Sequence, residues 1–391
     1  MAIVQAAVAD AVAAVGGEHE RFAMRGATTA GADAKAAATA AAHAALVALH
    51  PAAASSLDAA YGASLADIPD GSKKAEGIWV GQGAATAVLE LRAADGWNAS
   101  ASYTPAHRPG RWVPTPPAFA APLGVQWGRV KPFALQSADQ FRAAPPPALD
   151  SAAYVRDLRE VFELGGTGAT RRTPEVANAA RFWIVSGMQG WNPAARQVSA
   201  AKRLTLSQNA RLLALLNIAM ADALIACWDS KFAYDTWRPV TAIKIGGYGV
   251  TAGAGWTPLI ATPPFPAYPS GHACAADAAR VVLDRFLGPD GHSITLTSPT
   301  APGGRSPTTA SRRSPTRSTR PGWAAVSTSV AIRRRARSSG AASANTSAGP
   351  PCGYSTARPR IAARDRECRE PGRPPYPTPA RRRAYRAGVT P

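Results

Sequence analysis

The composition of the chain changes abruptly after about residue 302, and this break confines any packed core to the part before it. From Gly303 to Pro391 there is no Leu, Phe, Lys, Met or His, and Arg, Ser, Pro, Thr and Ala dominate. Such a segment cannot bury enough apolar surface to offset the entropy that it loses on ordering. We therefore expect a helical domain over residues 1–302, incomplete at both ends, and a basic, low-complexity tail over 303–391.

The net charge of +19 is concentrated in this tail. Nineteen Arg and three acidic residues follow position 302, a net +16, which leaves +3 for everything before it. A strongly basic chain suggests a nucleic-acid or anionic-membrane partner. Because the front part is nearly balanced in charge, we expect no specific nucleic-acid partner for it.

Alanine-rich, periodic segments in the front part predict an all-α fold, a helical bundle. An irregular, Pro-rich connection is expected over residues 105–147. The expected helices are Met1–Val15, Ala32–Leu49, Ala85–Ala94, Ser151–Leu164, Thr173–Gly187, Leu206–Asp229 and a last helix that begins after Gly271 and ends at Leu287.

No segment of the sequence is typical of a membrane anchor or a signal peptide. The longest apolar run, Leu212–Trp228, contains Asn217 and Asp222 and is barely long enough to span a bilayer, so we interpret it as a buried core helix. The first 17 residues lack a basic segment and carry Asp10 within their apolar pattern. The localisation of the protein stays open.

The four cysteines are Cys227, Cys274, Cys352 and Cys368, and they show neither a CxxC pair nor the spacing of metal ligands. We interpret them as buried thiols.

The first group of residues suited to chemistry is the pair Lys231 and Arg238. Residues seven apart in a helix lie on nearly the same face, so both cations would project toward one point. An oxyanion requires such donors, with Arg acting as a planar fork and Lys as a point charge. Taken alone, the pair is more typical of a solvated basic face.

The second group is the loop Thr262–Pro269, which leads into Ser270, Gly271 and His272. Ser270 is a good N-cap, and Gly271 lets a backbone amide approach an anion. His272, in the first helical turn, has the chemistry of a general acid or base. The alternative is an ordinary capped helix with a structural histidine.

Together, Lys231-x6-Arg238-Pro239 and the later Pro269-Ser-Gly-His272 resemble the signature of the vanadium-dependent haloperoxidase and type 2 phosphatidic acid phosphatase superfamily. The resemblance covers residues 1–300, and Trp256-Thr-Pro-Leu with the early Ala-rich helices looks like the bacterial haloperoxidase branch. It implies vanadate or phosphate bound by four residues, with His272 as the acid or base at its apical oxygen. These four anion-binding residues are Lys231, Arg238, Ser270 and Gly271.

Trp228 and Phe265 match haloperoxidases and would form the wall of the site. They favour a haloperoxidase, with vanadate as cofactor and peroxide and halide as substrates. The alternative is an acid phosphatase that acts on a phosphomonoester. The sequence encodes neither the halide or organic substrate nor the oligomeric state.

The superfamily pattern is broken at one position. An Arg followed six residues later by a His is expected after His272; that His ligates vanadium in the peroxidases and is the phosphorylated nucleophile in the phosphatases. The last histidine here is His292, which lacks such an Arg and is interpreted as a loop residue. As written, the chain is therefore expected to have little or no activity.

A frameshift near residues 302–306 would account for this break. Read two bases on, with suitable third bases, Ala325–Val330 gives Gly-Ile-His-Phe-Arg, and the junction of Pro321 and Gly322 gives an Arg six residues before that His. The alternative is a genuine basic tail, in a non-catalytic homologue, that binds anions or nucleic acid through runs such as Arg333–Arg337.

Overall fold

The helices account for most of the chain that the computed structural model describes, which comprises residues 1–184, 187–288, 292–301 and 305–310. All of these residues lie in one of the two units into which the chain divides, Met1–Thr346. The α-helices are α1 (Ala2–Gly16), α2 (Ala34–Leu49), α3 (Ala54–Ala66), α4 (Ser72–Arg92), α5 (Ala152–Gly165), α6 (Pro174–Phe182), α7 (Gly187–Ala201), α8 (Leu206–Tyr234), α9 (Pro239–Ile245) and α10 (Gly271–Leu287). Two short 3-10 turns are η1 (Pro51–Ala53) and η2 (Trp127–Arg129).

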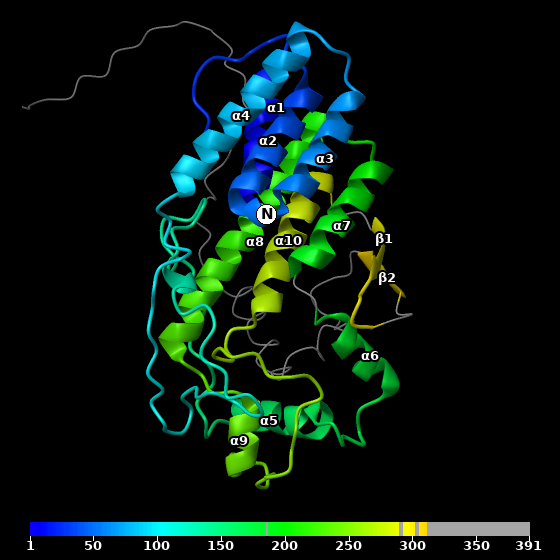
Figure 1. Ribbon diagram of the computed structural model, residues 1–391. Coiled ribbons are helices and arrows are strands. Elements are labelled where there is room, and N and C mark those ends of the chain that lie inside the picture. Colours follow the sequence, from blue (N-terminus) through cyan, green and yellow to red (C-terminus); the bar gives the residue numbers. More distant parts are fainter. Residues whose placement is uncertain (185–186, 289–291, 302–304, 311–391) are drawn as a thin grey trace, which may run out of the picture. The chain divides into compact units, whose positions relative to one another are not determined.

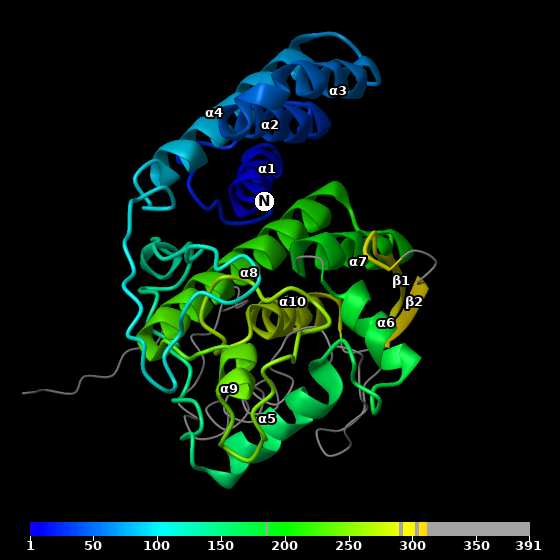
Figure 2. The same cartoon turned by 60° about the horizontal axis from the view of Figure 1, so that its bottom comes forward.

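The first layer consists of α1, α2 and α4, which pack closely because their facing side chains are small (Figure 2). A Cβ placed at Gly77 of α4 would lie 2.4 Å from the backbone oxygen of Asp33, the N-cap of α2, and one at Gly81 would lie 2.3 Å from the oxygen of Ala37 in α2. Those two glycines therefore allow the helix backbones to approach one another. The cluster is otherwise formed by buried alanines and a few valines.

Helix α8 joins this layer to the rest of the bundle, because it packs against α1 on one side and against α7 and α10 on the other (Figure 1). It begins with a capping box in which Thr205 and Gln208 exchange side-chain and backbone hydrogen bonds. It ends at Asp235, whose left-handed backbone (φ 52°) terminates the helix. Leu212, Leu216 and Met220 of α8 are fully buried in the core shared with α7 and α10.

A smaller apolar cluster lies around α5 and α9, at the end of the bundle where α8 stops (Figure 1). Trp237 is its centre, and its indole Nε1 donates to the hydroxyl of Tyr154 at 2.7 Å. Ser151 caps α5 by accepting from the Tyr154 amide. This cluster supports the backbone that leads from α8 into α9.

The expected helical bundle is confirmed, with one addition. A two-stranded antiparallel hairpin, β1 (His292–Thr297) and β2 (Arg305–Ala310), follows α10 and pairs His292 with Ala310. The interpretation of His292 as a loop residue is therefore wrong, since it is the first residue of β1. The hairpin reaches past residue 302, the expected end of the helical domain, and that domain boundary stays a prediction.

Several expected helix bounds also differ from those observed. The predicted helix Ala85–Ala94 is the second half of a longer helix, α4, because its glycines serve packing rather than breaking the helix. Thr173–Gly187 is too long, since α6 ends at Phe182. Helices α3, α7 and α9 were not expected; α7 carries Pro193 inside it, and α9 has only seven residues.

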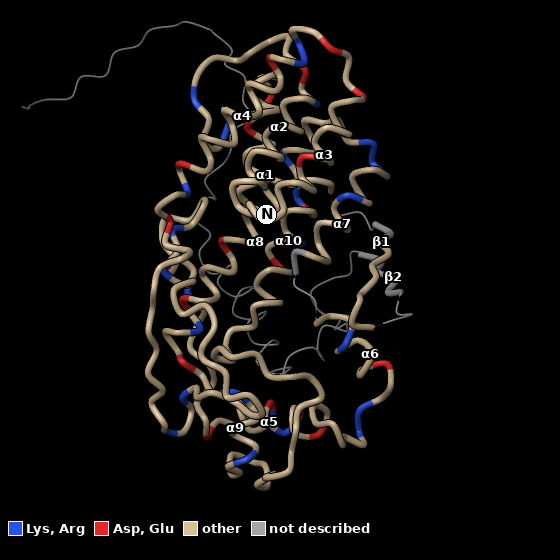
Figure 3. The backbone as a smooth tube through the Cα atoms, viewed as in Figure 1, with Lys and Arg blue, Asp and Glu red and all other residues tan. Residues whose placement is uncertain are grey.

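Charge and hydropathy fit a packed, mixed-charge bundle. Acidic and basic side chains are interspersed over the described elements, as the near balance before residue 302 predicts (Figure 3). Within the described residues, α8 is the one helix that is long and apolar enough to cross a membrane by length and composition. Its most apolar stretch is 56% buried inside the structure, and its packing between helices accounts for the same composition.

Candidate functional site

The centre of the candidate site is the loop between α9 and α10, which ends at the buried N-cap of α10. Residues 266–270 of this loop are all buried. Ser270 accepts a hydrogen bond at its Oγ from the amide of Ala273, as the N-cap prediction requires. The Ala267 amide donates to the carbonyl of Thr236 at 2.8 Å, which fixes the loop against the segment that joins α8 to α9.

Lys231 lies beneath this loop, fully buried at 1% exposure. Its ammonium donates to the carbonyl oxygens of Pro266 (2.8 Å), Ala267 (3.2 Å) and Pro269 (2.6 Å). An ammonium group has three N–H donors, and here it makes three bonds to loop carbonyls, so Lys231 has a structural role. It holds the loop in shape and places a positive charge directly under it.

Arg238 contacts the same loop from the start of α9 and not from α8. The expectation that Lys231 and Arg238 lie on one helical face is wrong, because α8 ends at Tyr234 and Arg238 is the N-cap of α9. Its Nε nevertheless donates to the carbonyl of Phe265 at 2.6 Å. The two cations are thus brought to one loop by a turn rather than by helical periodicity.

The guanidinium of Arg238 is only partly satisfied. The residue is 2% exposed, and among the described residues its buried Nη2 has no hydrogen-bond partner. Burial lowers the pKa of Arg238 to about 9, because a charge removed from water is disfavoured. A buried cation with an unused donor is an energetic cost that an anion would relieve.

Trp228 and Phe265 enclose this pair of cations. Their ring centroids are 5.0 Å apart, and Phe265 lies 5.0 Å from Lys231 Nζ and 4.7 Å from the Arg238 guanidinium carbon. Trp228 lies 5.6 Å from Lys231 Nζ. The rings exclude water from the cations and attract them through their π faces.

The glycine in Ser-Gly-His permits a close helix contact. A Cβ at Gly271 would lie 3.2 Å from the ring of Trp228, so the first turn of α10 rests on this tryptophan. His272 follows as the second residue of α10 and is half-buried. The first amides of a helix have no partner within it and carry the positive end of its dipole, which favours an anion there.

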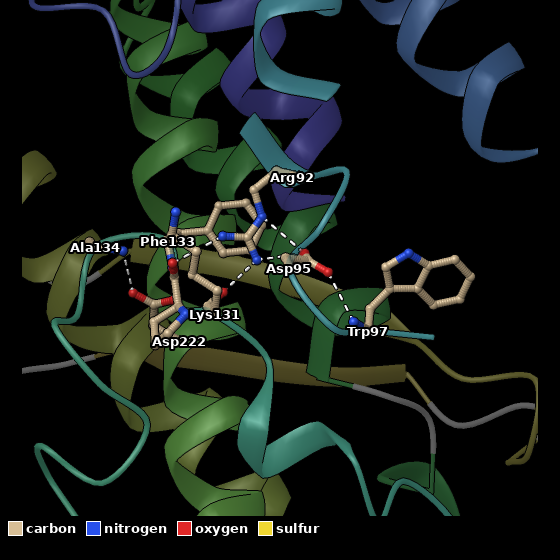
Figure 4. A network of polar contacts seen from close by, with 8 residues as sticks. Arg92, Asp95, Trp97, Lys131, Phe133, Ala134 and Asp222 are labelled. Atoms are coloured by element: carbon tan, nitrogen blue, oxygen red, sulfur yellow. Dashed lines mark hydrogen bonds and ion pairs between the residues drawn. The ribbon is translucent and has the colours of Figure 1, made fainter. Parts of the chain in front are cut away.

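A polar network that the sequence argument missed holds α8 in place. Asp222, in the middle of α8, accepts from the amides of Phe133 (2.6 Å), Ala134 (2.7 Å) and Leu135 (3.0 Å) (Figure 4). Arg92 at the end of α4 forms a buried ion pair with Asp95 at 2.7 Å, and it lies 3.9 Å over the Phe133 ring. The signal available in the sequence was the position of Asp222, a carboxylate within the apolar run Leu212–Trp228.

Two more pairs fix the end of α8 near the site. Tyr103 donates to Asp235 at 2.6 Å, and burial followed by this bond raises the pKa of Tyr103. Arg142 forms an ion pair with Asp229. These partners lie on the irregular connection before α5, where no periodic pattern marks them, and sequence reasoning had no means to identify them.

The residues that the structure describes contain no group of three or more His, Cys, Asp or Glu side chains that could hold a bare metal ion. The donors gathered at the loop are instead cationic and neutral nitrogen and hydroxyl groups. Such a set fits an oxyanion and not a metal cation.

Comparisons with known proteins agree with this geometry. A family model described as the VCPO second helical-bundle domain matches residues 211–341. The vanadium chloroperoxidase of Curvularia inaequalis is 30% identical over 189 residues, which covers 40% of this chain and 31% of that protein. The chain thus spans about a third of the length of this curated relative.

Solved structures extend the similarity over more of the fold. The crystal structure of a bacterial vanadium-dependent iodoperoxidase has a TM-score of 0.64 and 27% identity, and covers 75% of each chain. The crystal structure of an apo-type bacterial vanadium-dependent chloroperoxidase has a TM-score of 0.61 and 19% identity, and the match covers 79% of this chain and 82% of the chloroperoxidase chain. At this identity the similarity concerns the fold alone.

The helical bundle has the fold of the bacterial vanadium-dependent haloperoxidases of known structure. The family model, the curated relative and the iodoperoxidase structure together support the vanadium-dependent haloperoxidase superfamily for this chain, as the two sequence motifs suggested. Vanadium is the cofactor that the names of these relatives carry.

Proposed function

We propose that the loop between α9 and α10 binds vanadate in a haloperoxidase-like site. The observation that carries the proposal is the buried Arg238, whose Nη2 has no hydrogen-bond partner and whose guanidinium forms no ion pair with a carboxylate among the residues that the structure describes. An oxyanion supplies both the missing acceptor and the opposite charge. The superfamily relationship makes vanadate the preferred candidate over other oxyanions.

The residues of the site have distinct tasks in this proposal. Arg238 and the Ser270 hydroxyl donate to the anion oxygens, together with the Gly271 amide at the positive end of α10. Lys231 contributes its charge while it shapes the loop. His272 holds or releases the proton at the apical oxygen. Trp228 and Phe265 keep water away from the cations.

Bound vanadate would supply a Lewis-acid centre that activates peroxide for attack by a halide. The second histidine of the superfamily pattern has no counterpart at the expected spacing, because no Arg precedes His292 by six residues. We therefore propose that the chain as written binds the anion weakly and turns over halide and peroxide poorly or not at all.

The proposal predicts that Ser270→Ala weakens orthovanadate binding by at least about tenfold, the loss of one hydrogen bond to a charged group. The matched control is Ser151→Ala, which removes the serine cap of α5 and should leave the affinity unchanged. Calorimetric titration of both variants and the parent chain measures this. Equal affinities for the two variants would contradict the assignment of Ser270.

The catalytic part of the proposal is tested by two assays on the purified 391-residue chain. One measures halogenation of a phenol dye with vanadate and peroxide, and the other measures hydrolysis of nitrophenyl phosphate. We expect little turnover in either. Robust halogenation would show that the missing histidine is dispensable, and robust hydrolysis would favour the phosphatase alternative.

The tail beyond residue 310 lies outside the described residues, and the frameshift hypothesis concerns that part of the chain. We propose that resequencing the gene across codons 295–350 reveals a lost or gained base and restores Arg-x5-His. An uninterrupted single frame would overturn this and leave the basic tail as a genuine part of the protein.

A further inference from the structure

Two cysteines lie beside the loop between α9 and α10 that is proposed to bind the anion (the anion loop, residues 262–270), and the proposed function uses neither. Cys227 lies on α8, four residues before Lys231, and Cys274 lies on α10, four residues after Ser270. Both are free thiols, and Cys227 is 2% exposed whereas Cys274 is half-buried. Each thiol is close enough to the other for a hydrogen bond between their side chains.

The packing of α8 against α10 explains this proximity. The same stretch of α10 rests on α8 at Gly271, where a Cβ would lie 3.2 Å from Trp228 and 3.8 Å from Leu224. Helices that meet at a glycine approach more closely than usual. Cys227 lies on the same face of α8 as Leu224, and Cys274 is one turn further along α10 than Gly271.

The surroundings of the pair make Cys227 the thiol that ionises more readily. Burial alone would raise the pKa of Cys227, but the hydrogen bond from Cys274 and the nearby Lys231 ammonium lower it below its ordinary value. The hydrogen bond with Cys227, followed by burial, raises the pKa of Cys274 well above its ordinary value. One thiolate next to one thiol is the arrangement from which a disulfide forms.

We propose that Cys227 and Cys274 form a redox-modification site, in which a hydroperoxide oxidises the pair to a disulfide that links α8 to α10 across the anion loop. The oxidant is a small peroxide such as hydrogen peroxide. The inference rests on the placement of the two thiols and goes beyond the proposed vanadate site.

The chemistry balances with one peroxide for each pair. The thiolate of Cys227 attacks one peroxide oxygen, the O–O bond breaks, and hydroxide leaves, which gives a sulfenic acid. The thiol of Cys274 then attacks that sulfur, the S–O bond breaks, and water leaves as the disulfide forms. The proton lost when Cys227 ionised neutralises the hydroxide. Two thiols and one hydrogen peroxide thus give one disulfide and two waters, with two electrons passed to the peroxide.

Oxidation would reach the anion loop through a shared carbonyl. While its thiol is protonated, Cys227 Sγ donates to the Pro269 carbonyl at 3.7 Å, and Lys231 Nζ donates to the same oxygen at 2.6 Å. The first of these bonds is lost when Cys227 ionises. A disulfide removes the thiol proton from this arrangement and fixes the Cα atoms of Cys227 and Cys274 at the short separation that the bond requires. Lys231 and Ser270 lie one turn from the two sulfurs, so their positions change with it.

The test uses the full chain with Cys352→Ser and Cys368→Ser, which leaves the two cysteines of interest. The native protein is treated with hydrogen peroxide, denatured and alkylated, then digested with trypsin without reduction. We expect the peptide of residues 212–231 to be joined to that of residues 245–280, and both thiols to be lost together.

Two single variants in that background serve as controls. With Cys227→Ser or Cys274→Ser the internal link cannot form, and Cys274→Ser should instead yield a sulfenic acid that dimedone traps at Cys227. Circular dichroism of each variant checks that it folds. Both thiols still open to alkylation after peroxide, or links only between separate chains, would overturn the proposal.

The effect on the anion loop is measured with inorganic phosphate as the probe, which reducing agents leave intact. We expect the oxidised protein to bind phosphate roughly tenfold more weakly than the reduced protein, because small displacements of donors cost affinity. Dithiothreitol should restore the binding. Equal phosphate affinities of the oxidised and reduced protein would contradict the proposed effect of the disulfide on the anion loop. Absence of phosphate binding in both forms would contradict the proposed function, whereas the disulfide mapped by peptide analysis would not be affected.

Discussion

Replacing Arg238 with Met should leave the protein nearly as stable as before, although it removes a large buried side chain with a hydrogen bond. The lowering of the Arg238 pKa from 12.5 to about 9 corresponds to roughly 4–5 kcal/mol of unfavourable burial, at about 1.4 kcal/mol per pH unit. Against this stand the bond to the Phe265 carbonyl, about 1.5–3 kcal/mol, and the stacking on its ring, about 2 kcal/mol. These contributions nearly cancel.

The expected change in the free energy of unfolding of Arg238→Met is therefore within about 2 kcal/mol of zero, whereas a well-paired buried cation costs about 3–5 kcal/mol to remove. Urea denaturation without added anion measures it. Arg280→Met is the matched control, because Arg280 lies on α10 with a 56% exposed side chain and pairs with exposed carboxylates. A loss above about 3 kcal/mol for Arg238→Met would refute the view that its charge is uncompensated.

The same variants should behave differently with orthovanadate. An anion present at about a hundred times its Kd stabilises the parent chain by roughly 2.7 kcal/mol. If Arg238→Met weakens binding about a hundredfold, that gain falls to roughly 0.4 kcal/mol. Arg280→Met should keep the full gain. An unchanged gain in Arg238→Met would show that the anion binds elsewhere.

Three further predictions concern packing and charge. Gly81→Ala should destabilise the protein by about 2–3 kcal/mol, since its Cβ would lie 2.3 Å from a backbone oxygen of α2. Gly83→Ala on the same helix is the control and should stabilise the protein by about 0.5–1 kcal/mol. Thermal unfolding of the two variants measures the difference. Lys231→Met should cost about 3–5 kcal/mol, because three loop carbonyls lose their donor, and a loss below about 1 kcal/mol by urea denaturation would contradict this. Burial raises the pKa of Asp235, and its hydrogen bond with Tyr103 opposes this only in part. The protonated carboxyl therefore stabilises the fold below its ordinary pKa of 3.8, and this stabilisation is lost as pH rises. Asp235→Asn cannot titrate, so the free energy of unfolding of the parent chain relative to the variant should increase as pH falls toward 4 in a series of denaturation curves.

The sequence predicted those parts of the fold that depend on local patterns. The end of helix α10 was predicted at the observed residue and its start to within one residue, because Ser270 and Gly288 carry local signals for its start and end. The start of α8 was predicted for the same reason. The end of α8 was not predicted, because the sequence around Asp235 does not indicate that this residue adopts a left-handed backbone conformation.

The candidate site was predicted by residue type and not by geometry. Lys231 and Arg238 reach one loop through a turn at residues 235–237, and helical periodicity has no information about such a turn. The role of Lys231 as a support for loop carbonyls depends on contacts 35 to 38 residues apart in the chain. Only a folded structure brings these together.

Helix α8 has a consequence for how this protein tolerates insertions and deletions. Asp222 fixes its middle to the segment at 133–135, while Lys231 supports the anion loop at its end. One residue inserted between them would turn everything beyond it by about 100° around the helix axis. Lys231 would then face away from the loop even though every side chain of the site was still encoded. Between Asp222 and Lys231 the protein therefore tolerates substitutions but not insertions or deletions, because a change of length would move Lys231 away from the loop that it supports.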